Sequence, residues 1–324
     1  MIINDFEGFD GKHCETTATG SLMKHAGMEI SEPMMIGLGQ GFGFIYWKMS
    51  TMNLPFIGGR SKQFELTQNL CANLNITLDD IETGSRKKAW ANITEFIDQN
   101  IPVALQVDCY HLEYFDCAFH FAGHFICVYG YDQTDAYIFD SGSFYKTGLE
   151  NLEKARFEKG PMSAKARSWS IKINQNQPAI KDVIPKAIKA VAKEFLNPPI
   201  KNLGYKGILK MSQNLSKWIE MAPSPEQDLV DSADLMEGGG TGGALFRNFY
   251  RDFLKECLEY LPGNQALEKA HDLYKYAADY WTEIAALIRK TGLTGENKHL
   301  ESAAAICFKT ADIEKNAMEI LIKI

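Results

Sequence analysis

The chain lacks the features that mark several large classes of protein. None of its 324 residues belongs to an apolar run approaching the ~18 residues of a membrane helix. The opening segment MIINDFEGFDG has neither a basic region nor an apolar region, so we expect no signal peptide. The net charge of −7 argues against a nucleic-acid surface, which is usually basic, and is compatible with a cationic substrate. We therefore expect a cytoplasmic protein with no membrane or nucleic-acid partner.

A disulfide or zinc framework is also missing. The seven cysteines are odd in number and never form a CxxC pair. Six of them lie in apolar stretches and are predicted to be reduced core residues: Cys71, Cys109, Cys117, Cys127, Cys257 and Cys307. The exception is Cys14, in the polar run GKHCETTATGSL.

The length suits about two domains, and the composition, 45% hydrophobic and 23% charged, is that of a globular protein. Residues 1–175 mix helical patterns with strand patterns, and NQNQPAIKD at 174–182 has the composition of a linker. Only helical patterns follow. We predict an α+β domain over 1–175 and an all-α domain over 182–324. Helices are expected at 14–26, 31–37, 64–73, 86–99, 182–196, 207–220, 243–261, 264–291 and 296–322, and strands at 101–110, 124–131, 135–140 and 167–173.

Cys14 is the first candidate for chemistry because it stands in the first turn of a predicted helix. Unpaired N–H groups and the helix dipole favour a thiolate there, by about 0.3–1 kcal/mol at an exposed site. The same N–H groups could bind an oxyanion. A buried structural cysteine is the alternative, which the polar flank from His13 to Thr16 makes less favourable.

His124 and Asp140 are the expected partners of Cys14. His124 opens the strand HFICVYGY and Asp140 closes AYIFD, and the short polar turn YDQTD predicts an antiparallel hairpin between them. Both residues then reach the same edge of the sheet. They share a face only if the turn is odd or the hairpin contains a bulge. Cysteine, histidine and carboxylate at element boundaries are what thiol-based acyl transfer requires.

The other histidines compete for this role. His120 lies four residues before His124, but the segment suggests loop and strand rather than helix, so we expect no metal and no cofactor. His13 adjoins Cys14, and its side chain should diverge at a helix start. His111 and Asp108 could line a substrate cleft.

Three glycine-rich segments are candidates for substrate binding. GLGQGFGFIYW at 37–47 lacks the strand and helix of a phosphate loop, so it is interpreted as a packed loop or a cleft wall, with Gln40 and Gly41 facing substrate. Arg60, after two glycines, could hold a carboxylate or phosphate. Thr241 interrupts GGGTGG at 238–243, which is either a hinge, as composition favours, or a tight loop that reaches the cleft.

Several segments together resemble one family. HCETTATGSLMKHAG with SEPMMIGLGQGFGF, then PVALQVDCY, then GHFICVYGYD with IFD, are similar to the N-terminal domain of the butirosin biosynthesis protein H family, and GTGGALFRNFYRDFLKE to its usual helical domain. The resemblance covers nearly the whole chain. It implies a papain-like fold and transfer of an aminoacyl group from an acyl carrier protein to an aminoglycoside amine. Cys14 would be the nucleophile, His124 the base and Asp140 its orienting partner.

One departure from the papain pattern concerns the oxyanion site. No glutamine stands shortly before Cys14, and Asn4 is the nearest upstream amide side chain. Three functions stay open: a cysteine acyltransferase that uses a carrier-bound thioester and an amine acceptor, a hydrolase with the same groups, and a non-catalytic binding protein. The sequence leaves the donor, the acceptor and the oligomeric state undefined.

Overall fold

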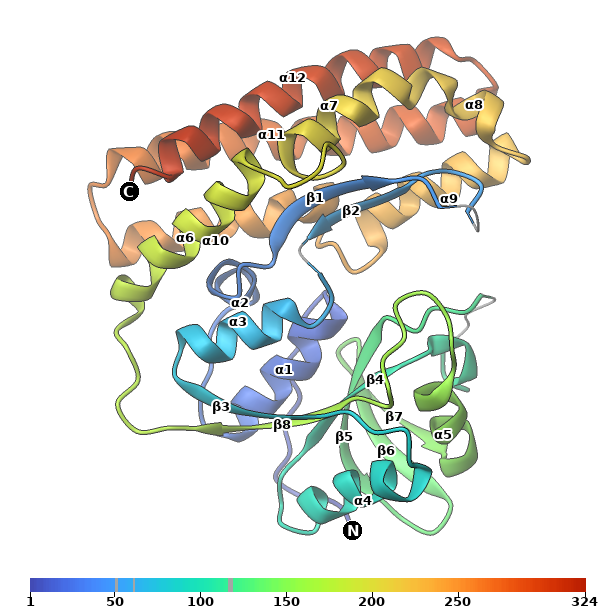
Figure 1. Ribbon diagram of the computed structural model, residues 1–324, viewed down its shortest axis with the longest axis vertical. Coiled ribbons are helices and arrows are strands. Elements are labelled where there is room, and N and C mark those ends of the chain that lie inside the picture. Colours follow the sequence, from blue (N-terminus) through green and yellow to red (C-terminus); the bar gives the residue numbers. More distant parts are fainter. Residues whose placement is uncertain (50–51, 61, 116–118) are drawn as a thin grey trace. The chain divides into compact units, whose positions relative to one another are not determined.

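The computed structural model describes residues 1–49, 52–60, 62–115 and 119–324; Cys117, a predicted core cysteine, lies outside these ranges. The chain forms two compact units, one of Met1–Met35 with Gln63–Pro178 and one of Ile36–Lys62 with Ala179–Ile324 (Figure 1). The break after Pro178 falls inside the predicted linker. Residues 36–62, however, leave the first unit and join the second, which differs from the predicted division.

The first unit is built on an antiparallel six-stranded sheet with the order β3-β8-β4-β5-β6-β7. Its helices include three that the sequence predicts well, α1, α3 and α4, and one that it misses, α5. The strands are β3 (Ile76–Ile81), β4 (Val103–Val107), β5 (His124–Tyr131), β6 (Asp135–Asp140), β7 (Ser143–Gly148) and β8 (Ser168–Ile173), and the helices are α1 (Cys14–His25), α3 (Glu65–Asn73), α4 (Arg86–Ile97) and α5 (Leu149–Phe157).

Helix α1 packs against β5 and β4, and its small side chains allow the close approach. All of its residues from Glu15 to Met23 are buried. Gly20 is one of them, and a Cβ atom there would lie 2.7 Å from the ring of Phe9. A helix that is buried on most sides is fixed by the core, so its first residue is held firmly relative to the sheet.

The β5–β6 hairpin contains the bulge on which the position of Asp140 depends. Cys127 pairs with Phe139 and Val128 with Ile138, but the next pair is Gly130 with Tyr137, so one residue is inserted on β5. Continuing the register beyond Cys127 puts Asp140 opposite Ile126, two residues from His124. Because side chains alternate, His124 and Asp140 share a face. Without the bulge they would lie on opposite faces.

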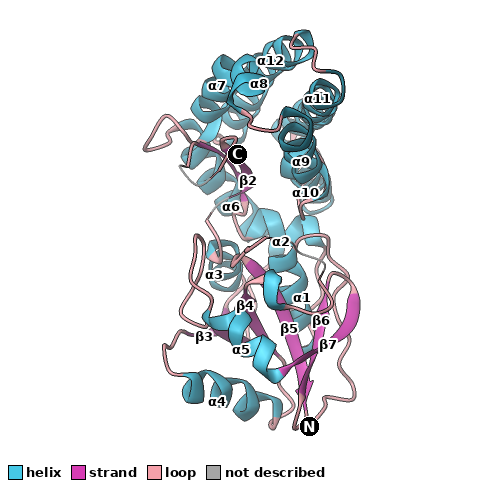
Figure 2. Cartoon of the chain, turned by 90° about the vertical axis from the view of Figure 1, so that its right-hand side faces the viewer, coloured by secondary structure: helices cyan, strands magenta, loops and turns pink. Residues whose placement is uncertain are grey.

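The second unit is mainly helical, as Figure 2 shows, and contains one strand pair. Helix α12 lies beside both α11 and α7. The strands are β1 (Phe42–Trp47) and β2 (Phe56–Arg60), and the helices are α6 (Ile180–Leu196), α7 (Gly204–Asn214), α8 (Trp218–Met221), α9 (Pro225–Gly238), α10 (Arg247–Tyr260), α11 (Gln265–Thr294) and α12 (Lys298–Leu321). Helix α2 (Glu32–Leu38) begins in the first unit and ends in the second. Within the described ranges, no helix is both long and apolar enough to cross a membrane.

Residues 42–47 form a strand, not the loop that their glycines suggested, because alternate aromatic side chains are buried among helices. Phe42 stacks on Tyr250 with ring centroids 4.2 Å apart, and Tyr46 accepts a hydrogen bond from the Trp218 indole. The Arg247 guanidinium lies 4.8 Å from the centre of the Phe42 ring. These contacts place 36–62 in the second unit.

Candidate active site

Cys14 is the first residue of α1 and differs from the other described cysteines in exposure. Cys71, Cys109, Cys127, Cys257 and Cys307 are buried, whereas Cys14 is partly exposed. Burial raises the pKa of the Cys71 thiol to about 12, and it also raises the pKa of the Cys127 thiol. Of the cysteines in the described ranges, therefore, Cys14 is the one that solvent and a substrate can reach.

Two buried glutamates fix the start of α1. The Glu32 carboxylate accepts hydrogen bonds from the backbone N–H groups of Lys12 and His13, at 2.9 and 2.8 Å, and from the hydroxyl of Thr16 at 2.6 Å. The residue after Cys14, Glu15, accepts the N–H of Thr67 at 3.0 Å, near the start of α3. The turn before Cys14 and the first turn after it are thus both tied to other elements.

Sequence reasoning did not identify either glutamate as a positioning residue. Glu32 stands in the SEP segment that carries the family resemblance, but its partners are about twenty positions earlier in the chain. Such a contact is visible only in the folded structure. His13 itself is buried, and its backbone N–H, like that of Lys12, donates to Glu32.

His124 and Asp140 form a buried hydrogen-bonded pair on the sheet. The His124 Nε2 atom lies 2.7 Å from Asp140 Oδ2, and Asp140 is 1% exposed. Asp140 also accepts hydrogen bonds from the hydroxyls of Tyr114 and Ser141, each at 3.1 Å. Burial raises the pKa of Asp140, but the charge of His124 and these hydrogen bonds outweigh it and hold the pKa below its usual range.

The side chain of Cys14 interacts with the same imidazole. Burial lowers the pKa of His124, whereas the charge and hydrogen bond of Asp140, and then those of Cys14, raise it to about 10. Because Nε2 is bound to Asp140, Nδ1 is the ring nitrogen left to face the sulfur. Such an arrangement can hold a thiolate beside an imidazolium, with a carboxylate behind the ring.

Two aromatic residues on the β4–β5 connection complete the surroundings of the pair. The Phe115 ring lies 5.0 Å from the imidazole of His124, centre to centre. Tyr114 stacks on Tyr145 of β7 at 4.3 Å while its hydroxyl donates to Asp140. Aromatic rings on a buried ion pair exclude water and strengthen the attraction between the charges.

The remaining first-unit candidates lie in a different cluster. The strand predicted over 101–110 ends at Val107, because the Asp108 carboxylate accepts the N–H of Tyr110 and starts a 3-10 turn, Cys109–His111. His111 is bound to Glu158 at 2.8 Å, and His120 to Asp108 at 3.2 Å. No contact to Cys14, His124 or Asp140 is found for His111 or His120 in the described part of the chain, so the cleft-lining role of His111 stays a prediction.

The predicted substrate contacts Gln40, Gly41, Arg60 and Thr241 all belong to the second unit. Gln40 has a φ of 53°, and it ends α2 together with Gly41, whose N–H donates to Ile36. The Thr241 hydroxyl donates to the carbonyl of Met236 at 2.8 Å, and Thr241 is buried. Hydrogen bonds therefore hold the GGGTGG run as a tight loop at the end of α9 rather than an open hinge. Binding of substrate by these residues remains a prediction.

An oxyanion site is constrained by what Glu32 already binds. The N–H groups of Lys12 and His13 donate to Glu32, and that of Thr17 donates to the carbonyl of His13. The exposed Asn4 has no described contact to the site. A backbone oxyanion site would therefore use the first-turn N–H groups of α1, beginning with that of Cys14 itself.

Two family descriptions match the chain. "Butirosin biosynthesis protein H, N-terminal" matches residues 13–141, and "Domain of unknown function (DUF4872)" matches residues 150–321. A search of curated proteins found no match. The first match begins one residue before Cys14 and ends one residue after Asp140, so it encloses the whole candidate site.

Proposed function

Since the chain belongs to the butirosin biosynthesis protein H family, we propose that it is a cysteine-dependent acyltransferase of secondary-metabolite biosynthesis. It moves an acyl or aminoacyl group from a carrier-protein thioester to the amine of a small acceptor. The observation that carries the proposal is the chain of contacts from Cys14 through the buried imidazole of His124 to Asp140.

A papain-like arrangement of the first unit is part of this proposal. In such a fold a helix begins at the nucleophilic cysteine and packs on an antiparallel sheet that carries the histidine and its polar partner. The packing of α1 on β5 and β4, and the pairing of His124 with Asp140, support this assignment.

The first chemical step is acylation of Cys14. The thiolate Sγ attacks the carbonyl carbon of the thioester, and the resulting oxyanion is stabilised by first-turn N–H groups of α1. When the tetrahedral intermediate collapses, the bond from carbon to the carrier sulfur breaks. The leaving thiolate takes the proton of the His124 imidazolium, which leaves an acylated Cys14, a neutral imidazole and a free carrier thiol.

The second step returns the enzyme to its starting state. A neutral amine attacks the acyl carbon of the Cys14 thioester, and His124 takes one amine proton as the new C–N bond forms. The C–S bond to Cys14 then breaks, which releases the amide and restores the thiolate beside an imidazolium. Asp140 keeps the ring oriented throughout and stabilises its cationic form.

Product analysis with a small thioester tests the proposal. We expect incubation with an acyl-N-acetylcysteamine thioester and a panel of amines, aminoglycosides included, to yield an amide, and this product to disappear in Cys14→Ala and His124→Gln. His25→Gln is the matched control, because His25 lies at the other end of α1, partly exposed and bound to the Asn100 carbonyl. Enzyme-dependent release of free acid without amide would identify a hydrolase, and no turnover of any thioester would favour a binding protein.

A further inference from the structure

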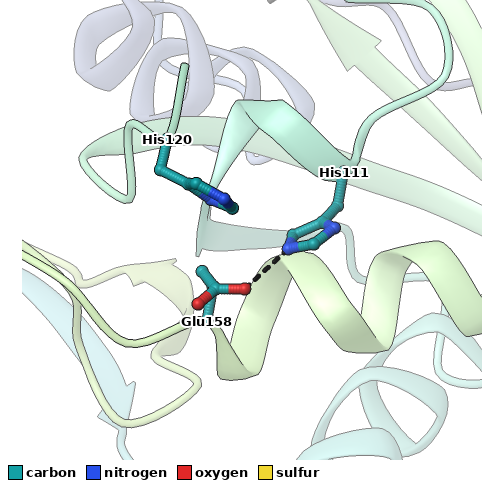
Figure 3. A group of neighbouring side chains, drawn as sticks. All are labelled: His111, His120 and Glu158. Carbon is teal, nitrogen blue, oxygen red and sulfur yellow. Dashed lines mark hydrogen bonds and ion pairs between the residues drawn. The ribbon is translucent and has the colours of Figure 1, made fainter. Parts of the chain in front are cut away.

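Three metal-ligating side chains meet in the first unit outside the candidate active site. The nearest ligand atoms of His111, His120 and Glu158 all lie within 4.8 Å of one another. Figure 3 shows the two imidazole rings and the carboxylate directed toward a common space, with His111 Nε2 and Glu158 Oε2 2.8 Å apart. Two imidazoles and one carboxylate are a typical protein ligand set for Zn²⁺.

The three residues come from separate places in the chain and are each fixed by backbone structure. His111 ends the 3-10 turn after β4, His120 precedes β5, and Glu158 directly follows α5. The second oxygen of Glu158, Oε1, accepts the backbone N–H of Lys159 at 3.1 Å, which holds the carboxylate beside His111.

Asp108 supplies an independent indication that His120 is oriented as a ligand. Its Oδ2 atom lies 3.2 Å from His120 Nδ1, and its Oδ1 atom accepts the N–H groups of Tyr110 and Phe121 at 3.0 and 3.1 Å. Asp108 is 1% exposed, so the carboxylate cannot turn away. Because Asp108 is bound to Nδ1 of His120, Nε2 is the ring nitrogen left to bind a metal. A carboxylate is the usual outer partner of a zinc-bound histidine.

We propose that His111, His120 and Glu158 bind a zinc ion, with water in the fourth position. Ligand atoms around tetrahedral zinc lie about 3.4 Å apart, given metal–ligand distances of about 2.0–2.2 Å. The three ligand atoms already lie within 4.8 Å of one another, so small side-chain adjustments suffice to reach that spacing. This inference does not depend on the proposed acyltransferase function.

The ion would join the β4–β5 connection to the end of α5. That connection also carries Tyr114, which donates to Asp140, and Phe115, whose ring lies against His124. The zinc site is thus assigned a structural role that fixes this connection beside the candidate active site. The prediction that the chain holds no metal considered His120 with His124, whereas the structure brings His120 next to His111.

Metal titration of the full-length protein tests the site. After removal of metals with a chelator, we expect one equivalent of Zn²⁺ to bind in competition with a chromophoric chelator and to raise the melting temperature. His111→Ala and His120→Ala should each weaken binding at least about tenfold, and Asp108→Asn about 10–100-fold. His25→Ala and Cys14→Ala should leave the affinity unchanged, and Co²⁺ bound in place of zinc should show no sulfur-to-metal charge-transfer band.

Two results would overturn the assignment. If tight binding persists in both His111→Ala and His120→Ala, the ion is held elsewhere in the chain. If the unaltered protein binds Zn²⁺ no more tightly than the His120→Ala variant does, the three side chains form only an ion pair with a neighbouring histidine. Because His120 is exposed, its variant is expected to fold, which can be verified from its circular dichroism spectrum.

Discussion

Replacement of Asp140 by asparagine is the sharpest single perturbation of the candidate site. Asparagine keeps the size and can keep the contacts, since its carbonyl oxygen can accept from His124 and Tyr114 while its amide donates to the hydroxyl of Ser141. The change removes only the negative charge. It therefore isolates the charge that, together with its hydrogen bond, raises the pKa of His124.

The expected size follows from the hydrogen bond that changes. A buried carboxylate at 2.7 Å from Nε2 makes a charge-assisted hydrogen bond, which is worth about 1–2 kcal/mol more than a neutral one. One pKa unit corresponds to about 1.4 kcal/mol. We thus expect the pKa of His124 to fall by about one unit or more in Asp140→Asn.

Nuclear magnetic resonance of protein labelled at histidine Cε1 measures this directly. The chain has seven histidines, and His124→Gln identifies the signal of interest. Asp135→Asn is the matched control, because it removes a partly exposed carboxylate from the start of the same strand, β6. An unchanged His124 titration in Asp140→Asn, or an equal shift in the control, would refute the coupling.

The same pair makes a pH-dependent contribution to stability. The lowered pKa of Asp140 gives a stabilisation that is lost as the pH falls through its folded value, below the ordinary value of about 4. The raised pKa of His124 gives a second stabilisation of the folded state. This stabilisation is fully present below about pH 6.5 and is lost as the pH rises toward about 10. The loss of unfolding free energy in Asp140→Asn should therefore be largest between about pH 4 and 6.5.

Three further substitutions probe other contacts, two of them beside the candidate site and one in the second unit. Glu32→Gln should lower the free energy of unfolding by about 1–3 kcal/mol, measured in urea, and should slow the alkylation of Cys14, since three donors to the Glu32 carboxylate lose a charged acceptor. Tyr114→Phe keeps the ring stacking but removes a hydrogen bond to Asp140, so the pKa of Asp140 should rise, which carboxyl titration by NMR can follow. Glu314→Gln should destabilise the protein by about 3–5 kcal/mol in thermal and urea unfolding, because it leaves the buried Arg247 guanidinium without its counter-charge; a loss below about 1 kcal/mol would contradict this.

The hairpin that carries His124 and Asp140 could be predicted from alternating apolar residues and a polar turn. Whether the two side chains lie on the same face of the sheet could not. The bulge between Val128 and Gly130 decides which face Asp140 occupies. The N-terminal segment joins the sheet beside the bulge, because Ile2 forms a β-bridge with Gly130. A Cβ atom on residue 130 would lie 3.0 Å from the Ile2 backbone, so the close approach favours glycine. A contact between residues so distant in the chain leaves no local pattern.

The strand at 42–47 shows a different limit of sequence interpretation. Glycines at 37, 39, 41 and 43 suggested a loop, yet Phe42, Phe44 and Tyr46 alternate as a half-buried strand requires. That signal was available. The residues that these side chains contact, among them Trp218, Tyr250 and Trp281, lie about 170 residues or more further along the chain. The sequence pattern therefore could not predict that this strand belongs to the second unit.

The candidate catalytic residues were accessible from residue type and element boundaries, whereas the residues that hold them were not. Cys14 at a helix start and His124 at a strand start follow from local patterns. Glu32, Glu15 and Tyr114 act through contacts between separate elements, and their sequence neighbourhoods are ordinary. The zinc cluster also depends on such contacts, since β4, β5 and α5 must fold before its three side chains meet.

The reaction of Cys14 with iodoacetamide at pH 6, followed by peptide mass spectrometry, tests the central claim most directly. A thiolate held by the His124 imidazolium should be alkylated at least about tenfold faster than glutathione, and His124→Gln should abolish the difference while His25→Gln preserves it. Alkylation of Cys14 at the rate of an ordinary thiol, or at the same rate in the His124→Gln variant, would contradict the account.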